Sequence, residues 1–189
     1  MAAPQRRWGW HQLHPDWASR LVADADLSPR ALVIDVGAGT GAITALLVET
    51  GARVIAVETH PVRASTLRER FGHSIVVVQA DAAALRLPRR SYHVVANPPF
   101  AATAALLRRL LQPGSRLVSA HLIVQSQAAR RWAGPDAPGR LRWERTFQVS
   151  VGPRVPRSAF RPPPQVDARV LRVVRRPGAR RNLKSPYAS

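Results

Sequence analysis

The sequence predicts an α/β fold in which helices cover both faces of a mostly parallel sheet. The first observation is that strand-like and helix-like segments alternate along the chain from about residue 31. The second is that the strand-like segments are almost wholly apolar, as strands buried on both faces are. The third is that the last two extended segments, at residues 145–151 and 166–174, resemble a terminal antiparallel pair. Together they predict a Rossmann-like sheet that ends in two antiparallel strands.

Each element of this fold follows from a local pattern in the sequence. The apolar run at residues 31–36 predicts the first strand, and the glycine-rich turn after it leads into a helix. Pro61 suits the first turn of the helix after the second strand, because a proline there gives up no helical hydrogen bond. Strands are expected at residues 31–36, 52–58, 74–81, 92–97 and 115–125, helices at 42–50, 60–71 and 103–111, and a loop at 134–140.

The length of 189 residues suits one domain with short appendages. We expect a basic N-terminal arm and cofactor-lid segment over residues 1–30. The Rossmann-like domain is expected over residues 31–174. Residues 175–189 are polar and carry five positive charges, so we expect a basic tail with little structure of its own.

The charge balance indicates a polyanionic partner. The chain has 29 basic and 11 acidic residues, a net charge of +18 and a pI near 12, which is typical of nucleic-acid-binding proteins. It has no cysteine, and its six histidines show no paired ligand spacing, so we expect no metal site. No secretory signal and no apolar run of membrane-spanning length occur. We therefore expect a cytoplasmic, monomeric protein.

Four segments that carry chemistry fall at the carboxyl ends of successive predicted strands, where open α/β sheets bind ligands. The glycines of "DVGAGTG", Gly37 and Gly39 among them, allow backbone to approach a ligand closely. Glu58 ends the second strand at the spacing expected of a carboxylate that binds ribose hydroxyls. Asp81 ends the third strand and could accept a hydrogen bond from the amine of an adenine. The fourth segment is Asn-Pro-Pro-Phe at residues 97–100.

The glycine spacing and the fourth segment help to distinguish a dinucleotide cofactor from S-adenosylmethionine. A dinucleotide pyrophosphate prefers G-x-G-x-x-G before a helix, whereas this chain has G-x-G-x-G. Dinucleotide chemistry also gives no reason for Asn-Pro-Pro-Phe. Methyl transfer from S-adenosylmethionine to an exocyclic amine does give one, so we favour that cofactor.

The amino nitrogen of adenine is a poor nucleophile because its lone pair is delocalised into the ring. The Asn97 side-chain oxygen and the Pro98 carbonyl would accept its hydrogens and favour a more tetrahedral nitrogen. The prolines would hold the turn rigid, and Phe100 would stack on the base, a contact worth about 1–3 kcal/mol. Asn97, Pro98 and Phe100 are therefore the predicted catalytic residues.

The motifs "VIDVGAGTGAITALL", "VVANPPF" and "PRSAFRPPPQVDARVLRV" resemble those of the rRNA adenine-N6 dimethyltransferases, which include the Erm resistance methylases and their small-subunit relatives. The resemblance covers roughly residues 8–175, and "SAFRPPPQVDARV" is its most specific part. It implies a class I methyltransferase that uses S-adenosylmethionine on adenine in unpaired rRNA. It also implies the cofactor contacts, which are Trp10, Gln12, Gly37, Gly39, Glu58, Asp81 and Asn97.

Three departures from that family matter. The N-terminal cofactor motif, usually Ser-Gln-Asn-Phe-Leu, is replaced by "WGWHQ", so Trp10 and Gln12 bring different chemistry. Phe100 stands where many Erm enzymes have tyrosine, which leaves open whether one or two methyl groups are added. The chain also stops where the family adds a helical domain, so RNA affinity is expected to come from its own basic residues. The candidates are Arg6, Arg7, Arg108, Arg109, Arg130, Arg131, Arg175, Arg176, Arg180, Arg181 and Lys184.

The leading interpretation is an Erm-type methyltransferase of naked or immature 23S rRNA, whose product would resist macrolides, lincosamides and streptogramins. A small-subunit rRNA dimethyltransferase is the nearest alternative, and the "WGWH" start favours the Erm interpretation over it. A DNA adenine methyltransferase is a further alternative, which "FRPPPQVD" disfavours. A non-enzymatic RNA-binding assembly factor on an inactive methyltransferase fold would be expected to lack cofactor residues that this chain keeps.

Overall fold

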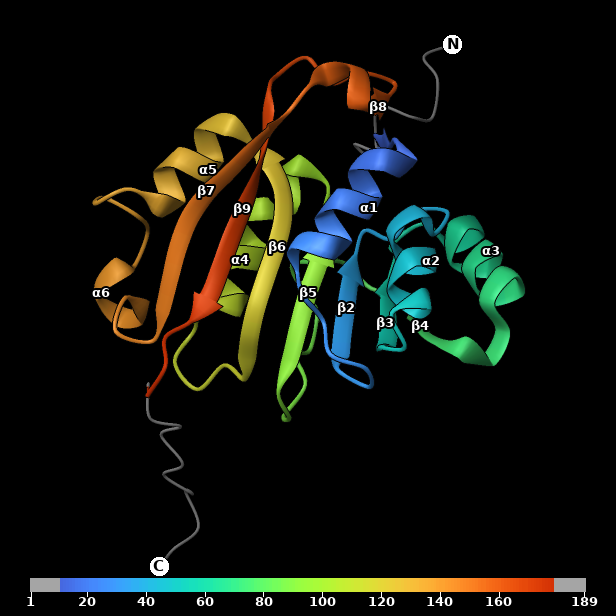
Figure 1. Ribbon diagram of the computed structural model, residues 1–189, viewed down its shortest axis with the longest axis horizontal. Helices are drawn as coiled ribbons and strands as arrows, with labels where there is room; N and C mark the ends of the chain where they lie inside the picture. Colours follow the sequence, from blue (N-terminus) through green and yellow to red (C-terminus); the bar gives the residue numbers. More distant parts are fainter. Residues whose placement is uncertain (1–10, 179–189) are drawn as a thin grey trace, which may run out of the picture.

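A seven-stranded sheet forms the centre of the molecule in the computed structural model, which describes residues 11–178 (Figure 1). Its strand order is β4-β3-β2-β5-β6-β9-β7. The strands from β4 to β6 are parallel, whereas β9 runs antiparallel to both of its neighbours. The bounds are β2 (Leu32–Val36), β3 (Arg53–Val57), β4 (Ile75–Val78), β5 (Tyr92–Ala96), β6 (Leu117–Gln125), β7 (Phe147–Val155) and β9 (Ala168–Arg175).

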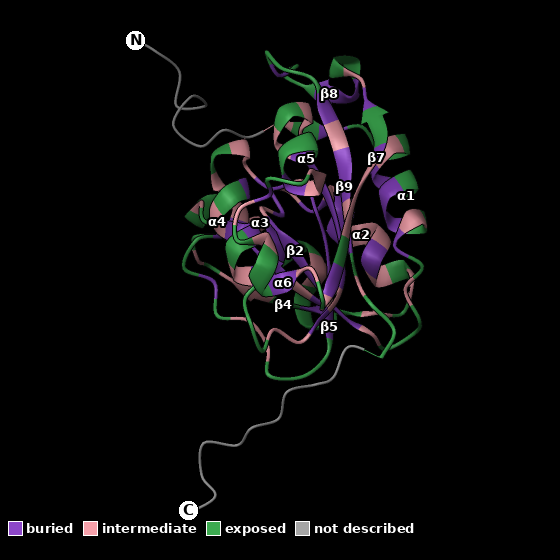
Figure 2. Cartoon of the chain, turned by 90° about the vertical axis from the view of Figure 1, so that its left-hand side faces the viewer, coloured by how far each residue is buried: buried purple, intermediate pink, exposed green. Residues whose placement is uncertain are grey.

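Helices cover the two faces of this sheet in two groups. One group packs its apolar side chains with the core on one face and comprises α1 (Pro15–Asp24), α2 (Ala42–Glu49) and α3 (Pro61–Phe71). The other group packs on the opposite face and comprises α4 (Thr103–Leu110), α5 (Ser126–Ala133) and α6 (Arg140–Trp143). The buried residues form two hydrophobic clusters, one on each face, while the outward helix faces are exposed (Figure 2).

A second, two-stranded sheet joins the two ends of the described chain. β1 (Gln12–Leu13) pairs antiparallel with β8 (Phe160–Arg161), with Gln12 opposite Arg161 and Leu13 opposite Phe160. The His14 N–H extends the pairing by donating to the Ala159 carbonyl at 2.7 Å. We call this pair the β1–β8 ribbon. Three short 3-10 helices lie between these elements: η2 (Gly72–Ser74), η3 (Phe100–Ala102) and η4 (Arg157–Ala159).

The fold class predicted from the sequence is confirmed, including the antiparallel pair β7–β9. Two details differ from the expectation. Residues 15–24 of the expected N-terminal arm form α1, whose Ala18, Leu21 and Val22 are buried in the core. β9 extends through Arg175, so the expected tail cannot begin there. Within residues 11–178 no helix is both long and apolar enough to cross a membrane.

Candidate active site

A cavity of about 500 Å³ opens at the carboxyl ends of β2, β3 and β5. The loops that follow these strands and β4 supply most of its lining. Of the predicted site residues it brings together Gly37, Glu58, Asp81, Asn97, Pro98 and Phe100. The volume suits a nucleotide-sized ligand.

The glycine-rich loop after β2 needs its glycines for conformation and for space. Gly37 and Gly39 have φ of +75° and +59°, a region that side chains disfavour. A Cβ on Gly37 would also lie 2.8 Å from Cδ of Pro99. The missing side chain therefore allows the Asn-Pro-Pro-Phe turn to lie directly against the glycine loop.

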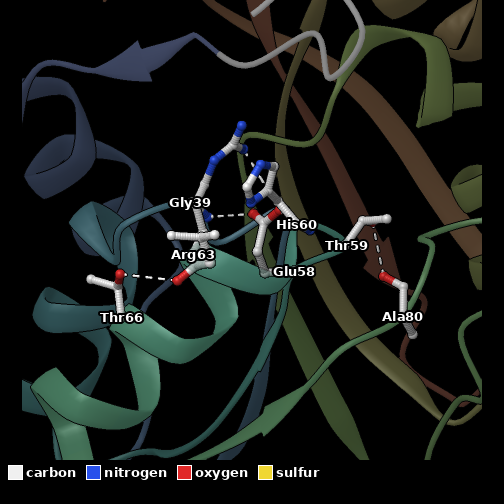
Figure 3. A network of polar contacts seen from close by, with 8 residues as sticks. Gly39, Glu58, Thr59, His60, Arg63, Thr66 and Ala80 are labelled. Atoms are coloured by element: carbon white, nitrogen blue, oxygen red, sulfur yellow. Dashed lines mark hydrogen bonds and ion pairs between the residues drawn. The ribbon is translucent and has the colours of Figure 1, made fainter. Parts of the chain in front are cut away.

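Glu58 is buried and held in place by backbone donors (Figure 3). The N–H of Gly39 donates to Glu58 Oε2 at 2.8 Å, and the N–H of His60 donates to Oε1 at 2.8 Å. Arg63 Nη1 lies 3.6 Å from Oε1 and adds an ion pair. Each carboxylate oxygen can accept more than one hydrogen bond, so Glu58 keeps capacity for ligand hydroxyls.

Asp81 lies on the opposite side of Glu58 from the glycine loop, in the segment after β4. Its Oδ1 accepts from the N–H of Ala83 at 2.7 Å, while the side chain is exposed and lines the cavity. Thr59 donates to the Ala80 carbonyl at 3.1 Å and ties this segment to the end of β3 (Figure 3). A carboxylate in this position can accept from an amine of a ligand.

Asn97 is oriented by a backbone group from the start of the described chain. Its Nδ2 donates to the His11 carbonyl at 2.9 Å. A carbonyl only accepts, so the amide nitrogen must face His11, and Oδ1 remains as the side chain's acceptor. Pro98 is buried and Phe100 half-buried beside it in the cavity wall.

Asp35 of β2 is buried beneath the glycine loop. Thr44 Oγ1 of α2 donates to its Oδ2 at 2.7 Å, whereas Oδ1 has no hydrogen-bond partner among the described residues. Burial raises the pKa of Asp35 to about 7, and the nearby charge of Glu58 acts in the same direction. Asp35 therefore holds its proton to a higher pH than an exposed aspartate does.

The N-terminal segment places its residues differently from the sequence-based expectation. Gln12 is exposed and lines a separate hollow with Ser158 and Arg161, so it does not join the main cavity. His11, which the sequence reasoning missed, lines the main cavity instead. His11 contacts Asn97 through its main-chain carbonyl, which every residue has, so the sequence gives no sign of this contact. Trp10 lies outside the described residues.

The predicted RNA-binding arginines fall into two structural groups. Arg108, Arg130 and Arg131 are exposed on α4 and α5. Arg109 instead donates to the carbonyls of Ala83 and Leu85. The remaining predicted positions Arg6, Arg7, Arg180, Arg181 and Lys184 lie outside residues 11–178.

Two arginines expected in a basic tail have structural contacts instead. Arg175 donates to the carbonyls of Leu117 and Ser115, and its guanidinium lies 4.7 Å from the centre of the Phe147 ring. Arg176 donates to the carbonyl of Glu144 at 2.9 Å. Arg175 thus has a structural role at the ends of β6 and β7, and a contact between it and RNA stays a prediction.

The residues present fit S-adenosylmethionine. Gly37 puts bare backbone in the cavity wall, and the cavity offers carboxylates at Glu58 and Asp81 for hydroxyl and amine hydrogens. No group of three or more potential metal ligands occurs among residues 11–178. The carboxylates of Glu58 and Asp81 make the cavity suitable for a neutral or cationic nucleoside.

Comparison with known proteins gives matches along most of the chain. The family model described as "Ribosomal RNA adenine dimethylase" matches residues 12–185. An rRNA adenine N-6-methyltransferase of Corynebacterium diphtheriae is 38% identical over 149 residues, which make up 77% of this chain and 58% of that protein. A ribosomal RNA small subunit methyltransferase A of Synechococcus sp. (strain JA-3-3Ab) is 34% identical over 195 residues, 94% of this chain and 69% of that protein.

Among solved structures, the 23S rRNA methyltransferase ErmE matches with a TM-score of 0.77 and 29% identity, over 86% of this chain and 68% of that one. The chain thus spans between 58% and 69% of the length of these three proteins.

Proposed function

Because the chain belongs to the ribosomal RNA adenine dimethylase family, we propose that it transfers methyl groups from S-adenosylmethionine to N6 of an adenine in 23S rRNA. A methyl group at the adenine where macrolides, lincosamides and streptogramins bind would lower their affinity. The physiological consequence of the activity would then be resistance to these three classes of antibiotic.

The observation that carries this proposal is the contact between the cofactor loop and the Asn-Pro-Pro-Phe turn. A Cβ on Gly37 would lie only 2.8 Å from Pro99, so the glycine-rich loop and the Asn-Pro-Pro-Phe turn are in contact. Both line the same cavity. A cofactor held by Glu58 and Asp81 and a base held by Asn97 and Phe100 would therefore meet in the same space. Such proximity converts a bimolecular transfer into a positioned one.

The chain's own residues have separable tasks in this proposal. Bound S-adenosylmethionine supplies an electrophilic methyl group. Asn97 Oδ1 and the Pro98 carbonyl accept the hydrogens of the target amine and stabilise the positive charge that develops on it. Phe100 stacks on the base, and the prolines fix the backbone of the turn.

The choice of 23S rRNA is supported by the "WGWH" start of the sequence and by the likeness to ErmE. The second candidate is methylation of small-subunit rRNA. It is favoured by one observation: the small-subunit relative aligns with 94% of this chain, against 77% for the first relative. Both candidates use the same chemistry on an unpaired adenine.

The testing experiment measures transfer from labelled S-adenosylmethionine to protein-free 23S rRNA, 16S rRNA and DNA in parallel. We expect label on 23S rRNA, with primer extension locating the adenine and nucleoside mass spectrometry counting the methyl groups. Label on 16S rRNA alone would establish the second candidate. Absence of label on every nucleic acid would contradict the proposed function.

Asn97→Ala tests the division of tasks. Loss of the Oδ1 acceptor is expected to reduce transfer by about 100-fold or more, as loss of a charge-stabilising group does. Cofactor affinity, measured by calorimetry, is expected to stay within a few-fold of the wild-type value. Gln127→Ala, which removes an exposed amide on α5, serves as the matched control. Equal loss of transfer and cofactor binding would refute the assignment of Asn97 to the base.

A further inference from the structure

His11 lies in the wall of the cavity where the target base is expected. It lines the cavity together with Asn97, Pro98 and Phe100. Its ring centre is 5.9 Å from that of Phe100, with 32° between the planes, and 6.4 Å from that of Phe160 in an edge-on arrangement. The imidazole is therefore held between two aromatic rings, one of which is the predicted stacking platform for the base.

Two hydrogen bonds to other segments fix His11, one through its main chain and one through its ring. Its carbonyl accepts from Asn97 Nδ2 at 2.9 Å, and its Nδ1 lies 2.7 Å from the carbonyl of Pro162. Pro162 belongs to the "SAFRPPPQVDARV" motif, to which the catalytic scheme above gives no task. The β1–β8 ribbon brings this motif beside His11. One task of the motif is thus to hold His11 in place.

The contact with Pro162 determines which ring nitrogen carries the proton. A carbonyl oxygen can only accept, so Nδ1 must be the donor. In the neutral imidazole Nε2 is then unprotonated and has a free lone pair. No hydrogen bond or ion pair to Nε2 occurs among the described residues. The ring therefore presents a proton acceptor whose orientation the protein has fixed.

We propose that His11 is a further catalytic residue, whose Nε2 accepts the proton that the target amine must release. The proposal rests on the proposed function, because it needs an adenine on Phe100. A base stacked on that ring lies about 3.5 Å above it, a separation typical of stacked rings, and so next to the imidazole 5.9 Å away. The amine would then be surrounded by Asn97 Oδ1, the Pro98 carbonyl and His11 Nε2.

The proton balance of the reaction requires such an acceptor or water. When N6 takes the methyl group, its lone pair becomes the new N–C bond and the sulfur keeps the electron pair of the broken S–C bond. N6 then carries a positive charge and one proton more than the neutral product. Transfer of that proton to Nε2 begins as the charge on N6 develops in the transition state, and it gives neutral N6-methyladenine and an imidazolium, which returns the proton to solvent.

Other charged groups surround the cavity and are unchanged by substitution of His11. They are Glu58 at the end of β3, Arg63 on α3 and Asp81 after β4. Arg161 of β8 precedes Pro162 in the sequence but lines a separate hollow. A pH dependence that disappears with the imidazole therefore belongs to His11 and not to these groups.

His11→Asn is the informative variant, because an asparagine Nδ2 can replace Nδ1–H as donor to Pro162 while no titratable nitrogen remains. The substitution also keeps the main-chain carbonyl that orients Asn97. Single-turnover transfer to 23S rRNA would be measured from about pH 5.5 to about pH 8.5, a range that spans the ordinary histidine pKa, for wild type and variant. His73→Asn, which removes an exposed imidazole from η2, is the matched control.

For the wild type we expect the rate to fall towards low pH, by up to about tenfold per pH unit, because only an unprotonated imidazole nitrogen can accept the proton. His11→Asn is expected to be about 100-fold slower at about pH 8 and to lose this acid limb. Its affinity for the cofactor, measured by calorimetry, should be unchanged. His73→Asn should keep both the wild-type rate and the acid limb.

An independent readout is the tautomer of His11 in long-range ¹H–¹⁵N NMR spectra, assigned with the His11→Asn variant. We expect the neutral ring to be the Nδ1–H tautomer; the Nε2–H tautomer would overturn the proposal. An unchanged acid limb or a wild-type rate in His11→Asn would also overturn it, as would parallel loss of cofactor affinity. Wild-type protein that labels no RNA would instead refute the proposed function, and this inference with it.

Discussion

Gly37 shows how one residue can serve two neighbouring parts of the site. Its φ of +75° disfavours any side chain, and a Cβ there would meet Pro99 at 2.8 Å. Replacement by alanine must therefore distort the backbone and push the Asn-Pro-Pro-Phe turn away from the cofactor loop. A single added carbon atom would separate the two halves of the cavity.

We expect Gly37→Ala to lower the free energy of unfolding by about 2–4 kcal/mol, from left-handed strain and overpacking together. Transfer and cofactor affinity should fall with it. Gly114→Ala is the matched control, because Gly114 has φ of +79° but a Cβ added to it would have no neighbouring atom within 4 Å. That variant should lose about 1–2 kcal/mol and keep its activity. Equal effects of the two substitutions in urea titrations would show that the contact with Pro99 is unimportant.

At the scale of elements, Asp24 at the end of α1 is paired with Arg172 of β9. Both oxygens of Asp24 accept from the Arg172 guanidinium, and His121 Nε2 lies 3.7 Å from Asp24 Oδ2. The hydrogen bond from Arg172 lowers the pKa of Asp24 below its usual value of 3.8, and the charges of Arg172 and His121 act in the same direction. Helix α1 is thus anchored to the last strand of the chain.

Asp24→Asn is expected to cost about 1–2 kcal/mol at neutral pH, as loss of a charged hydrogen-bond acceptor does. Because the folded pKa is lowered, the carboxylate stabilises the fold above the unfolded pKa of about 3.8 and loses this effect as pH falls through the folded value. The difference between wild type and variant in urea titrations should therefore shrink below about pH 4. Asp136→Asn, at an exposed acid, provides the control. A difference independent of pH would contradict the pairing.

The sequence predicted the elements that a pattern of neighbouring residues is enough to identify. Apolar runs such as residues 31–36 identify buried strands because the side chains themselves must avoid water, and the strand ends then locate Glu58, Asp81 and Asn97. The β1–β8 ribbon joins Gln12 to Arg161, which lie far apart along the chain, and no local pattern encodes that pairing. His11 was missed for the same reason, because its contact with Asn97 uses a carbonyl that every residue has.

At the scale of the whole molecule, the net charge of +18 is distributed over both structural and exposed arginines. Arg175 and Arg109 spend their donors on backbone carbonyls, whereas Arg108, Arg130 and Arg131 are exposed on one face. The exposed group can lie against phosphates without giving up such contacts. A count of basic residues therefore overstates the number of arginines whose side chains are free of structural contacts.

Replacing Arg130 and Arg131 together by alanine is expected to weaken RNA binding and to reduce the slope of log affinity against log salt by about 1.4, from two phosphate contacts on single-stranded RNA. Filter binding over a range of salt concentrations measures both the RNA affinity and this slope. Arg53→Ala with Arg68→Ala removes two exposed arginines elsewhere and should leave the slope unchanged. An unchanged slope in the α5 variant would remove that helix from the interface.

The β1–β8 ribbon also governs when the enzyme becomes competent during its synthesis. Residues 32–125, which carry the parallel strands, are made before residue 161, yet Asn97 acquires its orienting partner only when the ribbon fixes His11. The nascent chain would thus hold a nearly complete sheet with an unoriented amide. Under the proposed function, methyl transfer would therefore become possible only after residue 161 has been made, later than the parallel strands that carry the cavity.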